Sequence, residues 1–295
     1  MKILITGSTG FVGRHLVIKL LKDKHEILEL TIEPNVSTQL YGNKTEKFII
    51  NDDQEALVKC IESFKPEIVI HLASFLTSID DYVTLNKLIT TNIVFFCRLL
   101  DAVKNSGIKL FINTGTFAEY FKGDDIFDPA YLYAATKTAS RSFLDYYSKV
   151  YCFKQVTVVP YTIYGGQEDQ KKIIDLIYDS ISCNSSIDLS PGEQVLDFIH
   201  IDDVTDFYLR LIENKDNLPQ KSNFRLGVGN GHTLKQLARI IEVILNQKTK
   251  IHWGGIPYRA TDVMYAVADI SKINFWKPLI TLEDGVAQYI KNRQI

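Results

Sequence analysis

The stretch TGSTGFVG, at positions 6 to 13, constrains this chain most, because it places three glycines between an apolar run and a helical pattern. In such a turn the first glycine bends the chain tightly, the second lets a pyrophosphate approach the backbone, and the third lets the helix lie close to the strand. The helix N-terminus then favours phosphate oxygens. A bare tight turn is the alternative interpretation. The predicted dinucleotide-binding turn comprises Gly7, Thr9, Gly10, Phe11, Val12 and Gly13.

Strand and helix patterns alternate through the first half of the chain. Strands are expected at 25–32, 67–74, 109–116 and 153–160, and helices at 53–64, 87–107 and 131–151. Strands separated by helices of this length imply right-handed crossovers and a parallel sheet covered on both faces. The sequence therefore predicts an α/β, doubly wound (Rossmann) fold, in which ligands bind at the carboxyl ends of the strands.

The pattern changes near residue 165, after which helices dominate and the expected strands are short. We expect a dinucleotide-binding domain at 1–165, to which the segments at about 194–228 return. Residues 166–193 and 229–295 are then expected to form a smaller, mostly helical substrate-binding domain that closes over the strand ends.

Composition excludes several partners. The 295 residues are 46% hydrophobic and 23% charged, with a formal net charge of −2, so we expect a globular chain with no attraction to nucleic acid or anionic membranes. No segment approaches the length of a membrane span, and no cleavable leader is expected. The four cysteines and six histidines form no close pairs, which predicts no metal site and a reducing, cytoplasmic location.

The segment YAATK places Tyr133 and Lys137 one helical turn apart, and no other of the 15 tyrosines has a lysine four residues on. An adjacent ammonium group lowers the pKa of a phenol, which suits it to acid or base catalysis. An exposed helix pair is the alternative. Thr116, at the end of an expected strand, is the candidate to bind a substrate oxygen, whereas Thr114 could satisfy its own backbone.

The residues at the end of the second expected strand determine whether NAD or NADP binds. A carboxylate there holds the ribose of NAD, whereas an arginine accepts the extra phosphate of NADP. The sequence has Thr31 and Glu33 at this point, with neither the usual aspartate nor a nearby arginine. Glu33 would repel a phosphate, so NAD is favoured and NADP is kept as the alternative.

Taken in order, the motifs TGSTGFVG, IVIHLAS, FINTGTFAEY, YAATK, YGG, DFIHIDDV and PYRATDVMYAVADISK resemble the extended short-chain dehydrogenase/reductases over nearly the whole chain. These are nucleotide-sugar epimerases, dehydratases and reductases. The resemblance implies Thr116, Tyr133 and Lys137 as the catalytic trio, with Lys137 also holding the nicotinamide ribose. It implies a homodimer through the helices at about 85–105 and 131–151. The remaining expected cofactor contacts are Asp52, Leu72, Ala73, Asn92 and Pro160.

The late segments look most like the CDP-abequose synthase-like reductases of 4-keto-6-deoxy sugar nucleotides. Many members of the family have an arginine where this chain has Leu196, so Arg259 and Lys171 are the expected cations for the substrate's diphosphate. Solvated surface charge is the alternative for both.

The dehydratases of the family have an Asp-Glu pair where this chain has Phe117 and Ala118, and Glu119 lies one place too far along. Dehydration is therefore disfavoured, and Phe117 is expected to contact substrate. We expect an NAD(P)-dependent reductase acting at carbon 4 of a nucleotide-linked sugar. The alternatives are a 4-epimerase with tightly bound NAD and, from another class, a catalytically idle dinucleotide-sensing or scaffold protein.

Overall fold

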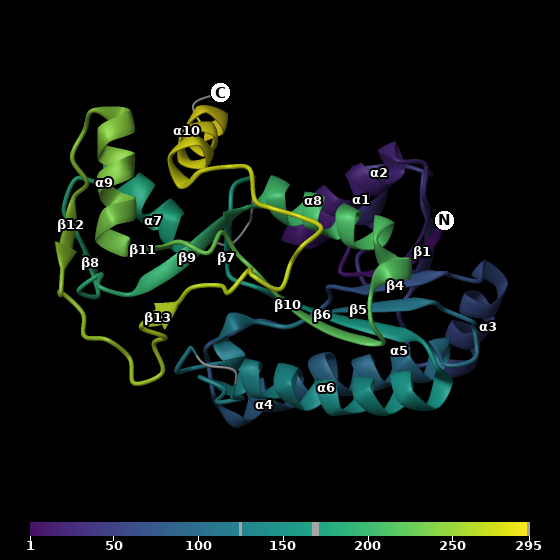
Figure 1. The fold of residues 1–295 in the computed structure, drawn as a ribbon. Coiled ribbons are helices and arrows are strands. Elements are labelled where there is room, and N and C mark those ends of the chain that lie inside the picture. The colour runs from purple at the N-terminus through teal and green to yellow at the C-terminus, as the bar shows by residue number, and fades with distance from the viewer. Residues whose placement is uncertain (124–125, 167–170, 294–295) are drawn as a thin grey trace.

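The computed structural model describes residues 1–123, 126–166 and 171–293. Its centre is a seven-stranded parallel sheet of order β10-β6-β5-β4-β1-β2-β3 (Figure 1). The strands are β1 (Lys2–Thr6), β2 (Glu26–Thr31), β3 (Glu46–Ile49), β4 (Ile68–His71), β5 (Leu110–Thr114), β6 (Lys154–Pro160) and β10 (Lys221–Leu226). The order reverses between β1 and β4, which is where such sheets bind ligands. The predicted doubly wound fold is confirmed.

Helices cover both faces of this sheet because its strands are apolar on both sides. On β1, Ile3 and Ile5 face α1 (Phe11–Lys22) and α8 (Ile201–Glu213), whereas Leu4 faces the opposite layer. That opposite layer contains α3 (Gln54–Phe64), α5 (Phe95–Val103) and α6 (Leu132–Tyr151), and Figure 1 shows α5 and α6 running beneath the sheet.

Three helical segments, α4 (Tyr82–Ile89), the π-helix η1 (Thr90–Val94) and α5, join end to end over residues 82–103. This run of 22 residues, with a mean hydropathy of 1.3 in its most apolar window, is by length and composition alone able to cross a membrane. The expectation that no segment approaches that length is therefore wrong. Leu88, Phe96, Leu99 and Leu100 of this run are buried, whereas Tyr82, Val83, Ile89 and Val94 are exposed.

A smaller part lies beside the carboxyl ends of the large sheet (Figure 1). It holds a four-stranded sheet centred on β9 and a two-stranded sheet of β8 and β12. Its elements are β7 (Thr162–Tyr164), α7 (Ile173–Ser180), β8 (Ile187–Leu189), β9 (Val195–His200), β11 (Gly231–Thr233), α9 (Leu234–Leu245), β12 (Ile251–Trp253), β13 (Tyr265–Ala266) and α10 (Leu282–Arg293). Within 194–228, α8 and β10 join the large sheet layer, whereas β9 belongs to the small sheet.

Two elements between 33 and 50 were not expected, α2 (Pro34–Tyr41) and the edge strand β3. β3 lies at the edge of the sheet, paired with β2, and none of its four residues is fully buried. An edge strand of this kind needs no apolar run, so the sequence EKFI does not indicate a strand. The short helices η2 (Phe117–Glu119) and η3 (Lys215–Asn217) complete the fold.

Candidate active site

The glycine turn lies at the end of β1, directly against the loop that follows β4. Gly7 has a φ of +72°, and a side chain there would reach the backbone of Ala73, with Cβ 2.6 Å from its nitrogen. A side chain at Gly13 would overlap the carbonyl oxygen of Gly7. Gly10 caps the N-terminus of α1. The turn therefore brings bare backbone and a helix N-terminus to the switch point of the sheet.

A pocket of about 870 Å³ runs from this turn along the ends of β2, β3 and β4. Eight of the expected cofactor residues line it: Gly7, Thr9, Gly10, Thr31, Glu33, Asp52, Leu72 and Ala73. Phe11, Val12, Gly13, Asn92 and Pro160 are not among its lining residues. The pocket thus extends from the bare backbone and helix N-terminus at Gly10, which favour phosphate groups, to Glu33 and Asp52.

Arg98 is a pocket residue that sequence reasoning missed. Its guanidinium donates to the carbonyl oxygen of Asn51 at 2.8 Å and lies 3.6 Å from a carboxylate oxygen of Asp52, so it holds the loop after β3. Arg98 thus lines the same pocket as Thr31 and Glu33, although it lies far from them in the sequence. Helical spacing could have indicated it, since Thr91, Phe95 and Arg98 all line the pocket at intervals of about one turn.

Glu33 faces the same pocket, where its carboxylate accepts a hydrogen bond from the Thr9 hydroxyl at 2.8 Å. This contact ties the end of β2 to the glycine turn. It also places a carboxylate in the pocket, and a carboxylate disfavours a nearby phosphate.

Tyr133 and Lys137 lie one turn apart on α6, and both are buried. Burial raises the pKa of the Tyr133 phenol above its ordinary value of 10, and a hydrogen bond with Ser74, a pocket residue that sequence reasoning missed, lowers it only in part. The expected lowering of this pKa is wrong, because desolvation disfavours the phenolate. Tyr133 therefore keeps its proton at neutral pH and is suited to act as an acid.

The Lys137 ammonium has the opposite shift. Burial lowers its pKa from 10.5 to about 8, while the neighbouring charge of Glu119 raises it and that of Arg141 lowers it. Lys137 is therefore mostly protonated at neutral pH and loses its charge in the mildly alkaline range.

Thr116 lies at the beginning of η2, where its hydroxyl oxygen accepts a hydrogen bond from the Ala118 N–H at 3.3 Å. The neighbouring Phe117 ring stacks on Tyr161 with ring centroids 5.6 Å apart, and Tyr131 stacks on Tyr133 at 6.1 Å. Tyr161 is buried, and Phe117 and Tyr131 pack against the same apolar cluster beside Thr116.

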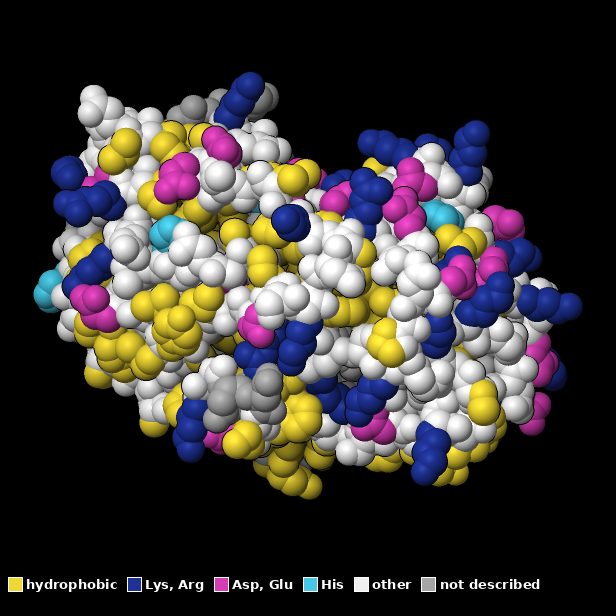
Figure 2. Space-filling model, viewed as in Figure 1, with side chains coloured by type: hydrophobic (Ala, Val, Ile, Leu, Met, Phe, Trp, Pro, Cys, Tyr) yellow, Lys and Arg dark blue, Asp and Glu magenta, His cyan; other side chains and the backbone are white. Residues whose placement is uncertain are grey.

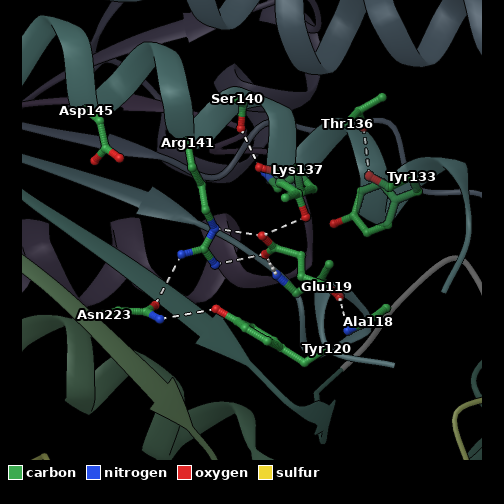
Figure 3. Close-up of polar contacts among 12 residues, drawn as sticks. Ala118, Glu119, Tyr120, Tyr133, Thr136, Lys137, Ser140, Arg141, Asp145 and Asn223 are labelled. Carbon is green, nitrogen blue, oxygen red and sulfur yellow. Dashed lines mark hydrogen bonds and ion pairs between the residues drawn. The ribbon is translucent and has the colours of Figure 1, made fainter. Parts of the chain in front are cut away.

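Glu119 is fully buried and does not reach a substrate site. Figure 3 shows its carboxylate facing the Arg141 guanidinium, with a shortest N···O distance of 2.6 Å. The same carboxylate accepts hydrogen bonds from the Thr116 N–H at 2.8 Å and the Thr138 hydroxyl at 3.3 Å. With Phe117 and Ala118 beside it, no carboxylate of this segment is available for acid or base chemistry.

Asn92 is a buried connector between elements. Its amide donates to the carbonyl oxygen of Phe75 at 3.1 Å and to the Thr136 hydroxyl at 3.0 Å, and its oxygen accepts from the Phe75 N–H at 2.8 Å. Asn92 thereby joins the loop after β4 to α6, which carries Tyr133.

The two expected substrate cations lie on the surface. Arg259 donates to the Ser78 hydroxyl at 3.3 Å, and the Lys171 ammonium binds the Asp179 carboxylate at 2.7 Å. Leu196 lies on β9 opposite Ala266. Figure 2 shows Lys and Arg side chains gathered around the middle of this face of the molecule. The Arg259 contact ties the late loop to the segment before α4.

A doubly wound sheet with a long pocket over a glycine turn is typical of the Rossmann class of dinucleotide-binding proteins, and this chain has that fold. More narrowly, the chain belongs to the NAD dependent epimerase/dehydratase family, whose sequence pattern matches residues 3–227. It is thus an enzyme of an NAD-dependent family, as the resemblance implied.

Three similar proteins cover nearly all of the chain. CDP-abequose synthase of Salmonella typhimurium is 26% identical in an alignment of 304 positions, which covers 98% of this chain and 97% of the relative. UDP-glucose 4-epimerase of Mycolicibacterium smegmatis is 25% identical, covering 99% and 98%. The solved structure of Thermotoga maritima UDP-glucose 4-epimerase with UDP-glucose has a TM-score of 0.87 at 22% identity, covering 100% and 99%, and this likeness shows the fold alone.

Proposed function

We propose that this protein is an NAD-dependent reductase that transfers a hydride to carbon 4 of a nucleotide-linked 4-keto-6-deoxyhexose. The observation that carries the proposal is the buried pair of Tyr133 and Lys137 beside Ser74, at the edge of the pocket. The likeness to CDP-abequose synthase supports the substrate class. The pocket residues would hold the reduced cofactor, NADH, which would supply the hydride.

Tyr133 acts as the acid of this reaction. As the carbonyl at carbon 4 accepts the hydride, its oxygen takes the proton from the Tyr133 hydroxyl, so the ketone becomes an alcohol and the phenol a phenolate. The Lys137 ammonium favours this phenolate by its charge. Thr116 donates a hydrogen bond to the same substrate oxygen, and the Phe117 and Tyr161 rings pack against the sugar.

The segment after Thr116 argues against dehydration. Removal of water from a sugar needs an acid and a base besides the tyrosine. Phe117 and Ala118 offer neither, and the Glu119 carboxylate is held by Arg141. Arg259 is the proposed contact of the substrate diphosphate, with a smaller part for Lys171.

A 4-epimerase with tightly bound NAD is the second candidate, because the same acid and base would serve oxidation and re-reduction of one carbon. The likeness to UDP-glucose 4-epimerase favours it. A panel of nucleotide sugars incubated with NADH separates the two. Stoichiometric loss of NADH supports the reductase, whereas isomerised sugar with no net loss of NADH supports the epimerase. Binding of NAD with no turnover of any sugar would indicate the idle scaffold.

We also propose a cytoplasmic homodimer. One face of α6 and of the run of α4, η1 and α5 is buried in the core. On their other faces these helices expose apolar side chains to solvent, namely Ile89, Val94, Phe143, Tyr146 and Val150. Pairing of these faces across a two-fold axis would cover them. Light scattering at micromolar concentration should give twice the mass of one chain, and Tyr146→Glu should reduce it to that of one chain. A parent protein with the mass of one chain would contradict the dimer.

A further inference from the structure

The buried pair of Glu119 and Arg141 has no part in the chemistry proposed above. Its side chains are 0% and 12% exposed, and two hydrogen bonds, of 2.6 and 3.0 Å, join the guanidinium to the two carboxylate oxygens. A buried ion pair contributes little to stability compared with well-packed apolar residues. Its presence therefore calls for an explanation other than stability.

The carboxylate of this pair holds the backbone that presents Thr116. It accepts the Thr116 N–H at 2.8 Å and the Thr138 hydroxyl at 3.3 Å. Gly115 leaves room for it, since a Cβ there would lie 2.5 Å from the carboxylate and 2.8 Å from the guanidinium. The pair thus joins the segment after β5 directly to α6.

The guanidinium is itself held in place from β10. It donates to the Asn223 side chain at 3.3 Å, and Asn223 donates to the Tyr120 hydroxyl at 3.2 Å (Figure 3). These contacts fix Arg141 between α6 and β10, so the carboxylate that it binds is also fixed.

The position of Arg141 on α6 brings the pair next to the catalytic side chains. Tyr133, Lys137 and Arg141 follow one another at intervals of four residues, so they share one face of the helix. The charges that act on Lys137 are Glu119, from the segment after β5, and Arg141, while buried His71 at the end of β4 is a further titratable neighbour.

The geometry points to Glu119 and Arg141 as a positioning pair that fixes the Thr116 segment against α6 and sets the charge beside Lys137. This inference rests on the proposed roles of Thr116 and Lys137. Neither member of the pair touches substrate. An apolar pair could fill the same space, but it would leave the Thr116 N–H without an acceptor. It would also remove the two opposite charges, of Glu119 and Arg141, that act on the Lys137 ammonium.

Two variants separate the charge from the hydrogen bond. Glu119→Gln keeps an acceptor for Thr116 and removes the charge that raises the pKa of Lys137. The alkaline loss of kcat should therefore move to lower pH by about one unit, the lower end of the effect of a neighbouring charge. The double variant Glu119→Leu with Arg141→Met removes both charges and the acceptor. Its kcat should fall about tenfold to a hundredfold with an unchanged Kd for NAD, as for a reacting group displaced by about 1 Å.

The matched control is Asp145→Asn, which removes a carboxylate one turn further along α6. Asp145 pairs with exposed Lys221 and, in Figure 3, lies apart from the Glu119 group. This variant should keep the parent's kcat and pH profile. Thermal melting of every variant shows whether it is folded. The double variant leaves neither Glu119 nor Arg141 behind as a charge without its partner, so it decides the positioning role even where Glu119→Gln fails to fold.

A titration of Lys137 by NMR, with the ε-carbon of lysine labelled and no substrate present, tests the charge effect without turnover. A pKa that is lower in Glu119→Gln than in Asp145→Asn supports the inference, and equal values overturn it. A folded double variant with the parent's kcat overturns the positioning role. If the parent reduces no nucleotide sugar, the proposed function fails, while the lysine titration still decides the electrostatic part.

Discussion

The cofactor pocket and the substrate side of the site are built in different ways. Among the residues that the structure describes, those that line the pocket lie between 7 and 98, at adjacent strand ends and at bare backbone such as Gly7. The proposed substrate side combines Phe117, Tyr161 and Arg259, and Arg259 donates to a serine 181 positions away in the sequence. A single side chain can therefore block cofactor binding, whereas substrate binding is divided among several contacts and should weaken by degrees.

Substitution of the acid at the junction of the two regions should have the largest effect. In Tyr133→Phe the proton donor beside Lys137 is lost, and general acid catalysis alone contributes about 10²–10⁴-fold to a rate. We expect kcat to fall by at least that range while the Kd for NAD, measured by calorimetry, stays close to that of the parent. Near-parent turnover would remove Tyr133 from its role.

The cofactor side is tested by Gly10→Val. The nearest protein atom to an added Cβ at Gly10 is the carbonyl oxygen of Gly7, at 3.3 Å, so the fold should adjust to the new side chain. A branched side chain would nevertheless occupy the space of the pyrophosphate. NAD affinity should fall about a hundredfold, or about 2.8 kcal/mol. Unchanged affinity in a folded variant would contradict the assigned phosphate site.

The substrate side is tested by Arg259→Ala. Charge-assisted hydrogen bonds are worth about 1.5–3 kcal/mol, so the KM for the nucleotide sugar should rise roughly tenfold to a hundredfold. NAD affinity should not change. Lys171→Ala should have a smaller effect, since Asp179 already binds that ammonium, and Lys109→Ala, far from the site in the fold, serves as control. Steady-state kinetics equal to the parent's for Arg259→Ala would show that this arginine is surface charge.

The pH dependence should show the smallest effect. The Lys137 pKa of about 8 means that the ammonium is present below this pH and lost above it. Because the ammonium favours the phenolate left by Tyr133, kcat for ketone reduction should be constant toward neutral pH and fall as pH rises through about 8. A profile without a loss between pH 7 and 9 would contradict the role of Lys137.

The sequence predicts well those features that depend on local backbone geometry. The glycine turn, the buried strands β4 and β5, and α6 with its Tyr133 and Lys137 are all recognisable from short segments. The parallel direction of the large sheet follows from the lengths of the helices between its strands.

The features missed depend on contacts between distant segments. β3 is an edge strand without an apolar run. Arg98 lies on a long helix, and only the direction of that helix brings it to the pocket. Ser74 and Tyr133 are far apart in the sequence and form a hydrogen bond only in the folded chain. The direction of the Tyr133 pKa shift was predicted wrongly because the spacing of two side chains indicates a charge pair, whereas the burial of the phenol depends on the whole fold.

The hydrogen bonds of Asn92 determine how far the segments around the pocket are ordered before a ligand binds. The loop after β4, which lines the pocket, and α6, which carries the proposed acid, are joined through hydrogen bonds of Asn92 to Phe75 and Thr136. The Thr136 hydroxyl in turn donates to the Tyr133 carbonyl oxygen at 2.7 Å. The conformational entropy of these segments is lost when the chain folds and not when a ligand arrives. Ligand binding free energy is then not consumed in bringing the acid into place.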